Sequence, residues 1–165
     1  MKSIIEVKQF IIELLKLFPD KKTDLAHIGK AYYYANRFAL ENYGTLVSTH
    51  YCVKLDFGPG IDDYKEIVDD LIEEGIICRE RQYFIRLINE KSFIKFPAVI
   101  LDSIKKAYLE VKDKSFNQLK EDTHRLKSYQ KASLYNAVDY SDDIFTDEEI
   151  ERAKLLLSDI PEFKK

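Results

Sequence analysis

Histidines and cysteines are the residues of this chain that could bind a metal ion. His27, His50 and His124 are far apart in the sequence. His50 and Cys52 are two residues apart, which would place both on one face of a strand, where they could share a metal. No second histidine or cysteine stands at metal-ligand spacing. A half-buried strand pair is therefore the simpler interpretation, and neither a metal nor a cofactor is expected.

Paired acids, Asp69–Asp70 and Glu73–Glu74, are the residues that could carry acid–base catalysis. Such catalysis needs a carboxylate whose surroundings shift its pKa. These acids fall on the polar side of an amphipathic helix predicted over residues 62–75, so a solvated face is expected. The sequence has no GxSxG, HExxH, P-loop or GxGxxG motif. The chain is therefore expected not to be an enzyme, and an unfamiliar catalytic site is a minor alternative.

Charge is segregated along a chain that is nearly neutral overall. The 165 residues carry a net charge of −3, which gives no general attraction to nucleic acid or to an anionic membrane. Residues 62–74 hold seven acids against one lysine, whereas residues 79–95 and 112–131 are basic and the tail from residue 139 is acidic. This pattern suits steering toward a protein partner. Internal ion pairing between tail and body explains it equally well.

The first eighteen residues predict an amphipathic helix rather than a signal peptide, because charged residues interrupt the apolar positions. No apolar run approaches the roughly 18 residues of a membrane span. A cytoplasmic location with no membrane contact is expected. Cys52 and Cys78 have no CxxC spacing and are predicted to be free, buried thiols.

Hydrophobic periodicity and turn residues predict the elements that position these groups. Helices are expected over residues 3–18, 24–42, 62–75 and 97–111, with a shorter one after 114 and a terminal one from 146. A strand is expected over 51–56, followed by a turn at the Gly-Pro-Gly of 58–60. Residues 76–88 predict a small hairpin, and residues 133–145 have little pattern.

Three consecutive tyrosines stand inside the second predicted helix. Successive helical residues are about 100° apart, so Tyr32, Tyr33 and Tyr34 spread over more than half of the circumference. A helix that is hydrophobic on all sides is a buried one. We therefore predict that at least two of the three are mostly buried, and that Asn36 binds a buried backbone group or water.

The order of helix, strand, helix and hairpin is also partly that of a winged helix, in which one helix enters the major groove of DNA. Here that helix carries the seven acids of residues 62–74, which phosphate would repel. Nucleic-acid binding is therefore not expected.

Two segments carry a family resemblance. "KAYYYANRFALENYG" at 30–44 and "FGPGIDDYKEIVDDLIEEGII" at 57–77 resemble the Panacea domain, the SocA-like family of bacterial and phage-associated antitoxins. A third segment, "SFNQLKEDTHRL", is similar to the family's short leucine and Thr-His segment. The matching residues are Lys30, Tyr33, Tyr34, Ala35, Leu40, Tyr43, Gly44, Gly58, Pro59, Leu119, Thr123 and His124. Asn36 stands where the family usually has aspartate, and the family's Pro-Trp is missing.

The resemblance implies a mainly α (α+β) fold: a multi-helix domain around a central aromatic helix, with a small inserted β element. This domain would span residues 1–132, and an acidic extension, 133–165, would end in a helix packed on the same domain. The implied function is that of an antitoxin, which neutralises a toxin encoded by a neighbouring gene through direct protein contact. The alternative is a winged-helix-like regulator that binds DNA or another regulatory protein. The oligomeric state and the toxin are left open.

Charge segregation alone supplies two candidate partner-binding surfaces. The first is the acidic face of the helix predicted over 62–75, and the second is the basic hairpin that follows it. Their residues are Glu66, Asp69, Asp70 and Glu73 on the helix, and Arg79, Arg81 and Arg86 on the hairpin.

Overall fold

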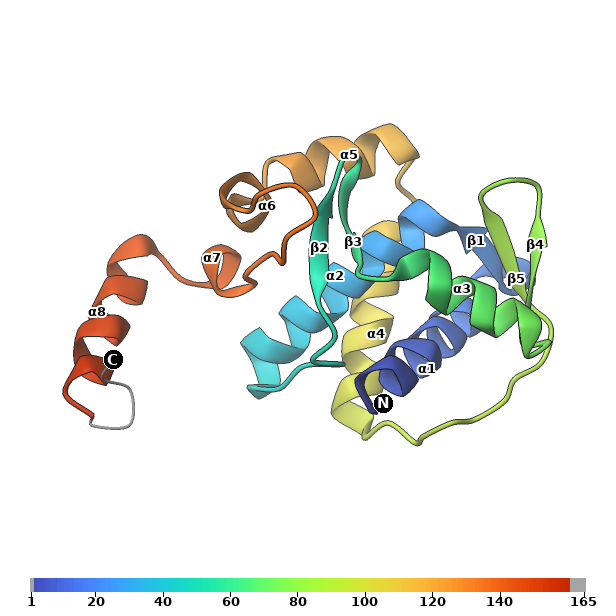
Figure 1. Cartoon of the computed structure of the whole chain (residues 1–165), viewed down its shortest axis with the longest axis horizontal. Coiled ribbons are helices and arrows are strands. Elements are labelled where there is room, and N and C mark those ends of the chain that lie inside the picture. The colour runs from blue at the N-terminus through green and yellow to red at the C-terminus, as the bar shows by residue number, and fades with distance from the viewer. Residues whose placement is uncertain (1, 161–165) are drawn as a thin grey trace.

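The computed structural model describes residues 2–160 and confirms a mainly helical α+β fold (Figure 1). The first part of the chain forms α1 (Lys2–Leu17), the short 3-10 turn η1 (Pro19–Lys21), β1 (Lys22–Asp24) and α2 (Leu25–Tyr43). The middle part forms β2 (Cys52–Leu55), β3 (Gly58–Ile61), α3 (Tyr64–Glu73), β4 (Ile77–Glu80) and β5 (Phe84–Leu87). The last part forms α4 (Ala98–Val111), α5 (Phe116–His124), α6 (Lys127–Lys131), α7 (Ser141–Ile144) and α8 (Asp147–Ser158).

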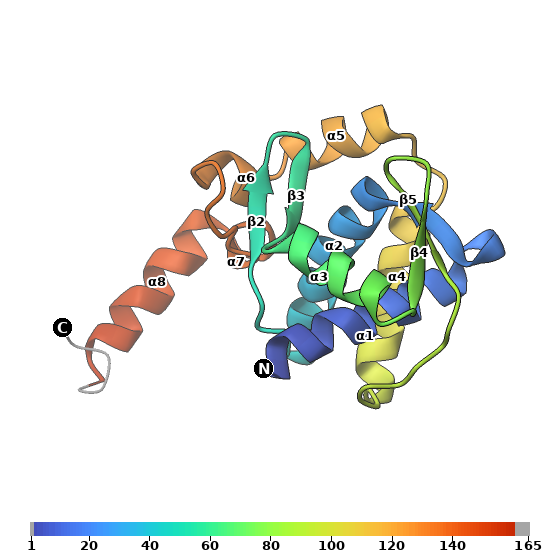
Figure 2. The same cartoon turned by 45° about the vertical axis from the view of Figure 1, so that its right-hand side comes forward.

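The tyrosine-rich helix α2 lies at the centre of the domain, with α1, α4 and the β2–β3 hairpin around it (Figures 1 and 2). Tyr32 and Tyr33 are fully buried and Tyr34 is almost so. The Tyr32 ring meets Phe10 of α1 edge-on, with 5.2 Å between ring centres, and Tyr33 lies 5.6 Å from Tyr140. The predicted burial of the tyrosines is confirmed, because different neighbours cover different sides of the helix.

Both ends of α2 are capped by residues that suit these positions. The Asp24 carboxylate accepts a hydrogen bond from the backbone N–H of His27 at 2.8 Å. Gly44 ends the helix in the left-handed conformation, and its N–H donates to the Leu40 carbonyl at 3.1 Å. Tyr43, next to this end, is exposed and donates from its hydroxyl to the Asp102 carboxylate at 2.7 Å.

Asn36 ties the loop after α2 to the helix. Its side-chain amide donates to the Tyr32 carbonyl at 3.0 Å, and its oxygen accepts from the backbone N–H of Ser48 at 3.2 Å. The side chain is completely buried. The prediction that Asn36 binds a buried backbone group is therefore confirmed.

Replacing Asn36 by aspartate is expected to destabilise the fold by about 2–3 kcal/mol at pH 7, because a buried carboxylate would face the Tyr32 carbonyl. Burial and that carbonyl would raise the pKa of the new carboxyl. The loss of stability should therefore be small below pH 4 and grow as the pH rises. Urea unfolding from pH 4 to 8 measures this. Asn42→Asp is the matched control, since Asn42 makes the same bond to the Phe38 carbonyl on the exposed side. An equal loss in both variants would contradict this account.

The antiparallel sheet has the strand order β1-β5-β4, with Thr23 and Arg79 both opposite Ile85. These elements follow the chain order of a winged helix, which is α1, β1, α2, α3, β4 and β5. The first of these strands pairs with the last, as in a winged helix. The second, two-stranded sheet of β2 and β3 is inserted between α2 and α3. In this comparison α3 takes the place of the recognition helix, and the β4–β5 hairpin is the wing.

The prediction of a turn at residues 58–60 is wrong. Gly58, Pro59 and Gly60 lie in β3, and the turn is formed by Asp56 and Phe57. Gly58 and Gly60 of β3 allow close packing instead. A Cβ on Gly29 of α2 would lie 3.3 Å from the Gly60 Cα, so the backbones of the helix and the strand pack closely together.

The segment 133–145 packs on the domain although its sequence has little pattern. It extends the edge of β2, where the Val138 N–H donates to the Cys52 carbonyl at 2.9 Å. The Asp143 carboxylate then accepts hydrogen bonds from the Tyr33 hydroxyl and from the backbone N–H of Ser128. These bonds join α7 to α2 and α6.

The terminal helix α8 differs from the expectation. It projects away from the domain in both views (Figures 1 and 2), and its side chains are exposed, with Leu155 at 69% and Leu156 at 66%. Residues 147–160 therefore do not pack on the domain, contrary to the expectation. A capping box of Thr146 and Glu149 starts this helix without tertiary packing, as the sequence predicts.

Ion pairs join the basic segment 112–131 to the acidic tail. Lys127 lies 2.6 Å from Asp147, and Lys131 lies 3.5 Å from Asp142 and 3.2 Å from Asp147. Internal pairing, one of the two explanations for charge segregation, is confirmed for these segments. Solvent screens these exposed pairs, so each contributes little to stability.

Both cysteines are free thiols, as predicted, but only Cys52 is buried, since Cys78 is half-buried. Within residues 2–160, no helix combines the length and the apolar character that crossing a bilayer would require.

Candidate binding groove

An apolar groove of about 660 Å³ opens between the start of α2, the β2–β3 hairpin and the tip of the β4–β5 hairpin. Aromatic and aliphatic side chains form most of its wall. Among the described residues that line it, Asp24 is the only acid and Lys30 the only base. The lining residues are Asp24, Leu25, Ala26, Gly29, Lys30, Leu55, Phe57, Gly58, Pro59, Gly60, Tyr64, Tyr83, Phe84 and Phe116.

A second hollow of about 550 Å³ continues the groove along α3. It shares Leu25, Tyr64 and Tyr83 with the first, so the two hollows adjoin. Its remaining lining comes from α3 and from the wing, and consists of Lys65, Val68, Arg79 and Gln82. Together the two hollows form one continuous groove between α2, α3 and the wing. This whole surface is called the α2–α3 groove.

Lys30 is a buried cation in the wall of this groove. Only 4% of its surface is exposed, and its ammonium lies 5.8 Å from the centre of the Phe116 ring. Within residues 2–160 the ammonium makes no hydrogen bond and no ion pair. Burial lowers the pKa of Lys30 to about 8, against the opposing charge of Asp24. A lysine of this kind is costly to the fold unless a ligand pairs with it.

Asp24 makes no ion pair with Lys30, and its carboxylate binds His27 instead, although its charge favours the protonated lysine. One oxygen accepts from the backbone N–H of His27, and the other lies 2.8 Å from the ring Nδ1. The second ring nitrogen lies 2.7 Å from the Lys114 carbonyl. Both partners accept hydrogen bonds, so both nitrogens must donate and the ring is cationic. Burial alone would raise the pKa of Asp24, but the bonds and charge of His27 hold it below its ordinary value.

The stability of the fold is expected to depend on the charge of His27. Burial of the ring opposes protonation, but Asp24 and the Lys114 carbonyl raise the pKa of His27 above 6.5. This contribution is complete below pH 6.5 and is lost as the pH rises through the folded-state pKa. The advantage of the unmodified chain over His27→Gln in urea unfolding should therefore shrink between pH 6 and 9. A difference that stays constant over this range would contradict a cationic His27.

Three residues of the family-like motifs, distant in sequence, meet beside the groove. A Cβ on Gly58 would lie 2.6 Å from Oγ1 of Thr123 and 2.8 Å from Cε of Lys30. Thr123 is buried and donates to the Leu119 carbonyl at 2.7 Å. Gly58 adopts φ 121°, a conformation open essentially to glycine. The glycine therefore provides the space in which Lys30 lies.

Of the remaining motif residues, Pro59 also lines the groove. Tyr33, Tyr34 and Ala35 instead belong to the buried core around α2. The His124 ring packs on Tyr129 with 4.6 Å between ring centres, and burial lowers the pKa of His124. Its Nε2 is buried and has no hydrogen-bond partner within residues 2–160.

The two predicted charged surfaces lie next to each other and partly neutralise one another. Asp69 of α3 lies 3.1 Å from Lys65 and 3.9 Å from Arg79 of β4. Arg86 pairs within the wing with Glu80 at 2.8 Å. Of the predicted partner-binding residues only Arg79 borders the groove. All seven are exposed: Glu66, Asp69, Asp70, Glu73, Arg79, Arg81 and Arg86.

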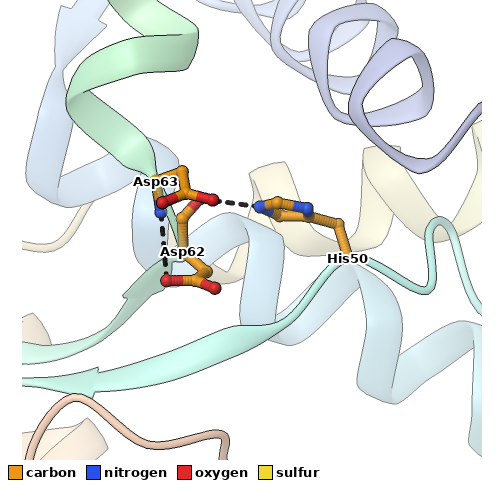
Figure 3. A group of neighbouring side chains, drawn as sticks. All are labelled: His50, Asp62 and Asp63. Atoms are coloured by element: carbon orange, nitrogen blue, oxygen red, sulfur yellow. Dashed lines mark hydrogen bonds between the residues drawn. The ribbon is translucent and has the colours of Figure 1, made fainter. Parts of the chain in front are cut away.

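His50 lies beside Asp62 and Asp63 rather than sharing a site with Cys52 (Figure 3). Side-chain atoms of the three that could bind a metal lie within 4.8 Å of one another. However, Nε2 of His50 lies 2.7 Å from the Asp62 backbone carbonyl, so this nitrogen is a donor and not a free ligand. Cys52 belongs to the hydrophobic core. The group is explained as the connection between the loop before β2 and the start of α3.

Sequence reasoning missed the groove itself. Phe57, Tyr83 and Phe116 come from three separate segments, and no spacing rule connects them. The only sequence signal was Lys30, a charged residue among the apolar positions of an otherwise buried helix. Comparisons with protein-family models, with curated proteins and with solved structures found no match.

Proposed function

We propose that this chain is a protein-binding module of the antitoxin type, which neutralises a toxin encoded by a neighbouring gene by holding it in direct contact. The observation that carries the proposal is the α2–α3 groove, an apolar surface with the unpaired cation Lys30 in its wall. Hollows of this size that are mostly apolar, with few polar groups, are characteristic of binding sites. The resemblance of residues 30–44 and 57–77 to the Panacea domain supplies the kind of partner.

The energetics of Lys30 support a binding role. The lysine lowers the stability of the free protein, because its charge is buried without a partner. A methionine or leucine would fill the same space without this cost. An ion pair between Lys30 and a bound partner would offset this cost, which explains the presence of a lysine at this position.

The experiment is co-expression with the products of the neighbouring genes. Each product is expressed alone and together with this chain, and growth and co-purification are measured. One product should stop growth alone, be neutralised by this chain and co-purify with it in stoichiometric amount. If no neighbouring product is toxic, the antitoxin proposal is contradicted. If one is toxic but neither rescued nor bound, it is contradicted as well.

Topology favours a second candidate, a winged-helix regulator. The strand order β1-β5-β4 and the place of α3 are those of a DNA-binding winged helix. The exposed acids of α3 oppose duplex binding, so this candidate would act on another regulatory protein. No salt-dependent shift of duplex DNA is expected at micromolar protein. Such a shift at this concentration would favour DNA binding instead.

Reversing the charge of the acidic face of α3 tests whether this face steers the partner during association. The triple variant Asp69→Lys, Asp70→Lys, Glu73→Lys should slow association with the neutralised partner about tenfold at low salt, while α3 stays folded. Stopped-flow association at two salt concentrations measures this. The control Glu41→Lys, Glu121→Lys, Glu151→Lys makes the same change of net charge on other exposed positions. Equal rates in the two variants would remove the acidic face as a steering surface.

A further inference from the structure

We infer that the α2–α3 groove takes an apolar segment of the partner protein that carries one acidic side chain, whose carboxylate pairs with Lys30. This inference names the chemistry of the partner and rests on the proposed protein-binding function. It depends on three properties of the groove: a cation that pairs with no residue of the described chain, apolar side chains in the same groove, and continuity with the second hollow.

Lys30 can pair with an anion that enters the groove. The residue is only 4% exposed, its ammonium makes no hydrogen bond and no ion pair within the described chain, and the nitrogen keeps contact with solvent. The neighbouring carboxylate of Asp24 is held by His27. The nearest ring, Phe116, offers only a cation–π contact at 5.8 Å. A carboxylate entering the groove would supply the missing partner in surroundings where an ion pair with good geometry is strong.

The groove beside Lys30 is apolar, so the residues of the partner around that carboxylate must be apolar too. Phe57 and Phe116 lie against each other, with 5.5 Å between ring centres, and both are exposed toward solvent. Tyr64 and Tyr83 line the same groove. The Tyr64 hydroxyl donates to the Leu25 carbonyl at 2.7 Å, so its polar atom is already satisfied. The Tyr64 ring can therefore contribute apolar surface without leaving its hydroxyl unpaired.

The length of the groove favours a side-chain carboxylate over a chain end. A C-terminal carboxylate placed at Lys30 would end the occupant there, with apolar residues on one side of it only. A passing segment has apolar residues on both sides of its carboxylate, and can continue past Tyr64 and Tyr83 into the second hollow. The inferred occupant therefore has an Asp or Glu with apolar residues on each side of it.

Binding of short peptides to the full chain tests this inference. The main probe is acetyl-Leu-Phe-Glu-Leu-Phe-amide, whose only charge is the glutamate. The matched probe has glutamine in its place. Backbone amide spectra of the full chain are recorded during titration, since Gly29, Gly58 and Gly60 report directly on the groove. The glutamate peptide should bind at least tenfold more tightly than the glutamine peptide, and the Lys30→Met variant should bind both equally.

Further probes separate the sources of the carboxylate. Leu-Phe-Leu-Phe with a free C-terminus represents a chain end, decanoate represents a small apolar acid, and decanol is its uncharged counterpart. Tighter binding of the free C-terminus or of decanoate than of the glutamate peptide would overturn the inferred occupant. Equal binding of the glutamate and glutamine peptides, or no shift of the groove glycines with any probe at millimolar concentration, would overturn it too.

This test is independent of the test of the antitoxin proposal. Selective binding of the glutamate peptide, together with non-toxic neighbouring products, would contradict the antitoxin proposal and support the inferred chemistry of the groove. A toxin that binds the chain and is neutralised by it, together with equal binding of both peptides, would support the antitoxin proposal and contradict the inferred chemistry of the groove.

Discussion

The Lys30→Met variant is expected to be more stable than the unmodified chain at pH 7, by about 3 kcal/mol, and to lose its partner. The pKa of Lys30 is about 8 in the fold against 10.5 for an ordinary lysine, and each pKa unit corresponds to about 1.4 kcal/mol. Methionine has a similar length and no charge, so it can fill the same space without the cost of a buried ammonium. Urea unfolding measures the gain.

The gain should depend on pH in a defined direction. A lysine whose pKa is depressed in the fold costs stability wherever it is charged in the fold, and the cost disappears as the pH rises from about 8 to above 10.5. The advantage of Lys30→Met should therefore be largest below pH 8 and vanish near pH 10.5. Lys65→Met, at a side chain that is 83% exposed, is the control and should change little. A Lys30→Met variant less stable than the unmodified chain at pH 7 would contradict the account of Lys30.

The second large effect is expected from Gly58→Ala, which should destabilise the fold by about 3 kcal/mol or more. Two causes act together. Alanine is strained at φ 121°, and its Cβ would lie 2.6 Å from Oγ1 of Thr123 and 2.8 Å from Cε of Lys30. Because Lys30 lines the groove, its displacement should change the groove, and we expect weaker binding of apolar probes as well. Thermal and urea unfolding measure the stability, and the glycine amide signals report on the groove.

Gly44→Ala provides the matched control for this substitution. Gly44 also has a positive φ, 65°, but a Cβ there would meet nothing within 4 Å. Its cost should be about 1 kcal/mol, the ordinary penalty of a left-handed alanine. Equal costs at the two glycines would show that the contacts of Gly58 with Thr123 and Lys30 contribute little.

Much of the fold follows from sequence patterns that act locally. The apolar periodicity of α3, the Gly44 end of α2 and the capping box of α8 can be read within a few residues, whereas the N-cap of α2 is Asp24 and not the predicted Thr23. The burial of the three tyrosines could also be predicted, since a helix that is apolar on all sides needs neighbours on all sides. The main error, the turn at 58–60, arose because glycine and proline usually mark turns, whereas here they allow a strand to pack closely against α2.

The candidate site was harder to predict because it depends on tertiary proximity. Lys30, Gly58 and Thr123 meet only after three segments have folded together. The charged residues Asp69 and Arg79 were predicted as two separate surfaces, but folding places them 3.9 Å apart, where they partly neutralise each other. A sequence shows charge along the chain, whereas the unpaired charge of Lys30 becomes visible only when its surroundings are known.

The measurement that tests the central claim most directly is capture of the neighbouring gene product by the unmodified chain and by Lys30→Met, side by side. The unmodified chain should retain the product in stoichiometric amount, whereas Lys30→Met should lose it although it is the more stable protein. Misfolding could not then explain the loss. Equal retention by a folded Lys30→Met variant would contradict the claim that Lys30 and the α2–α3 groove hold the partner.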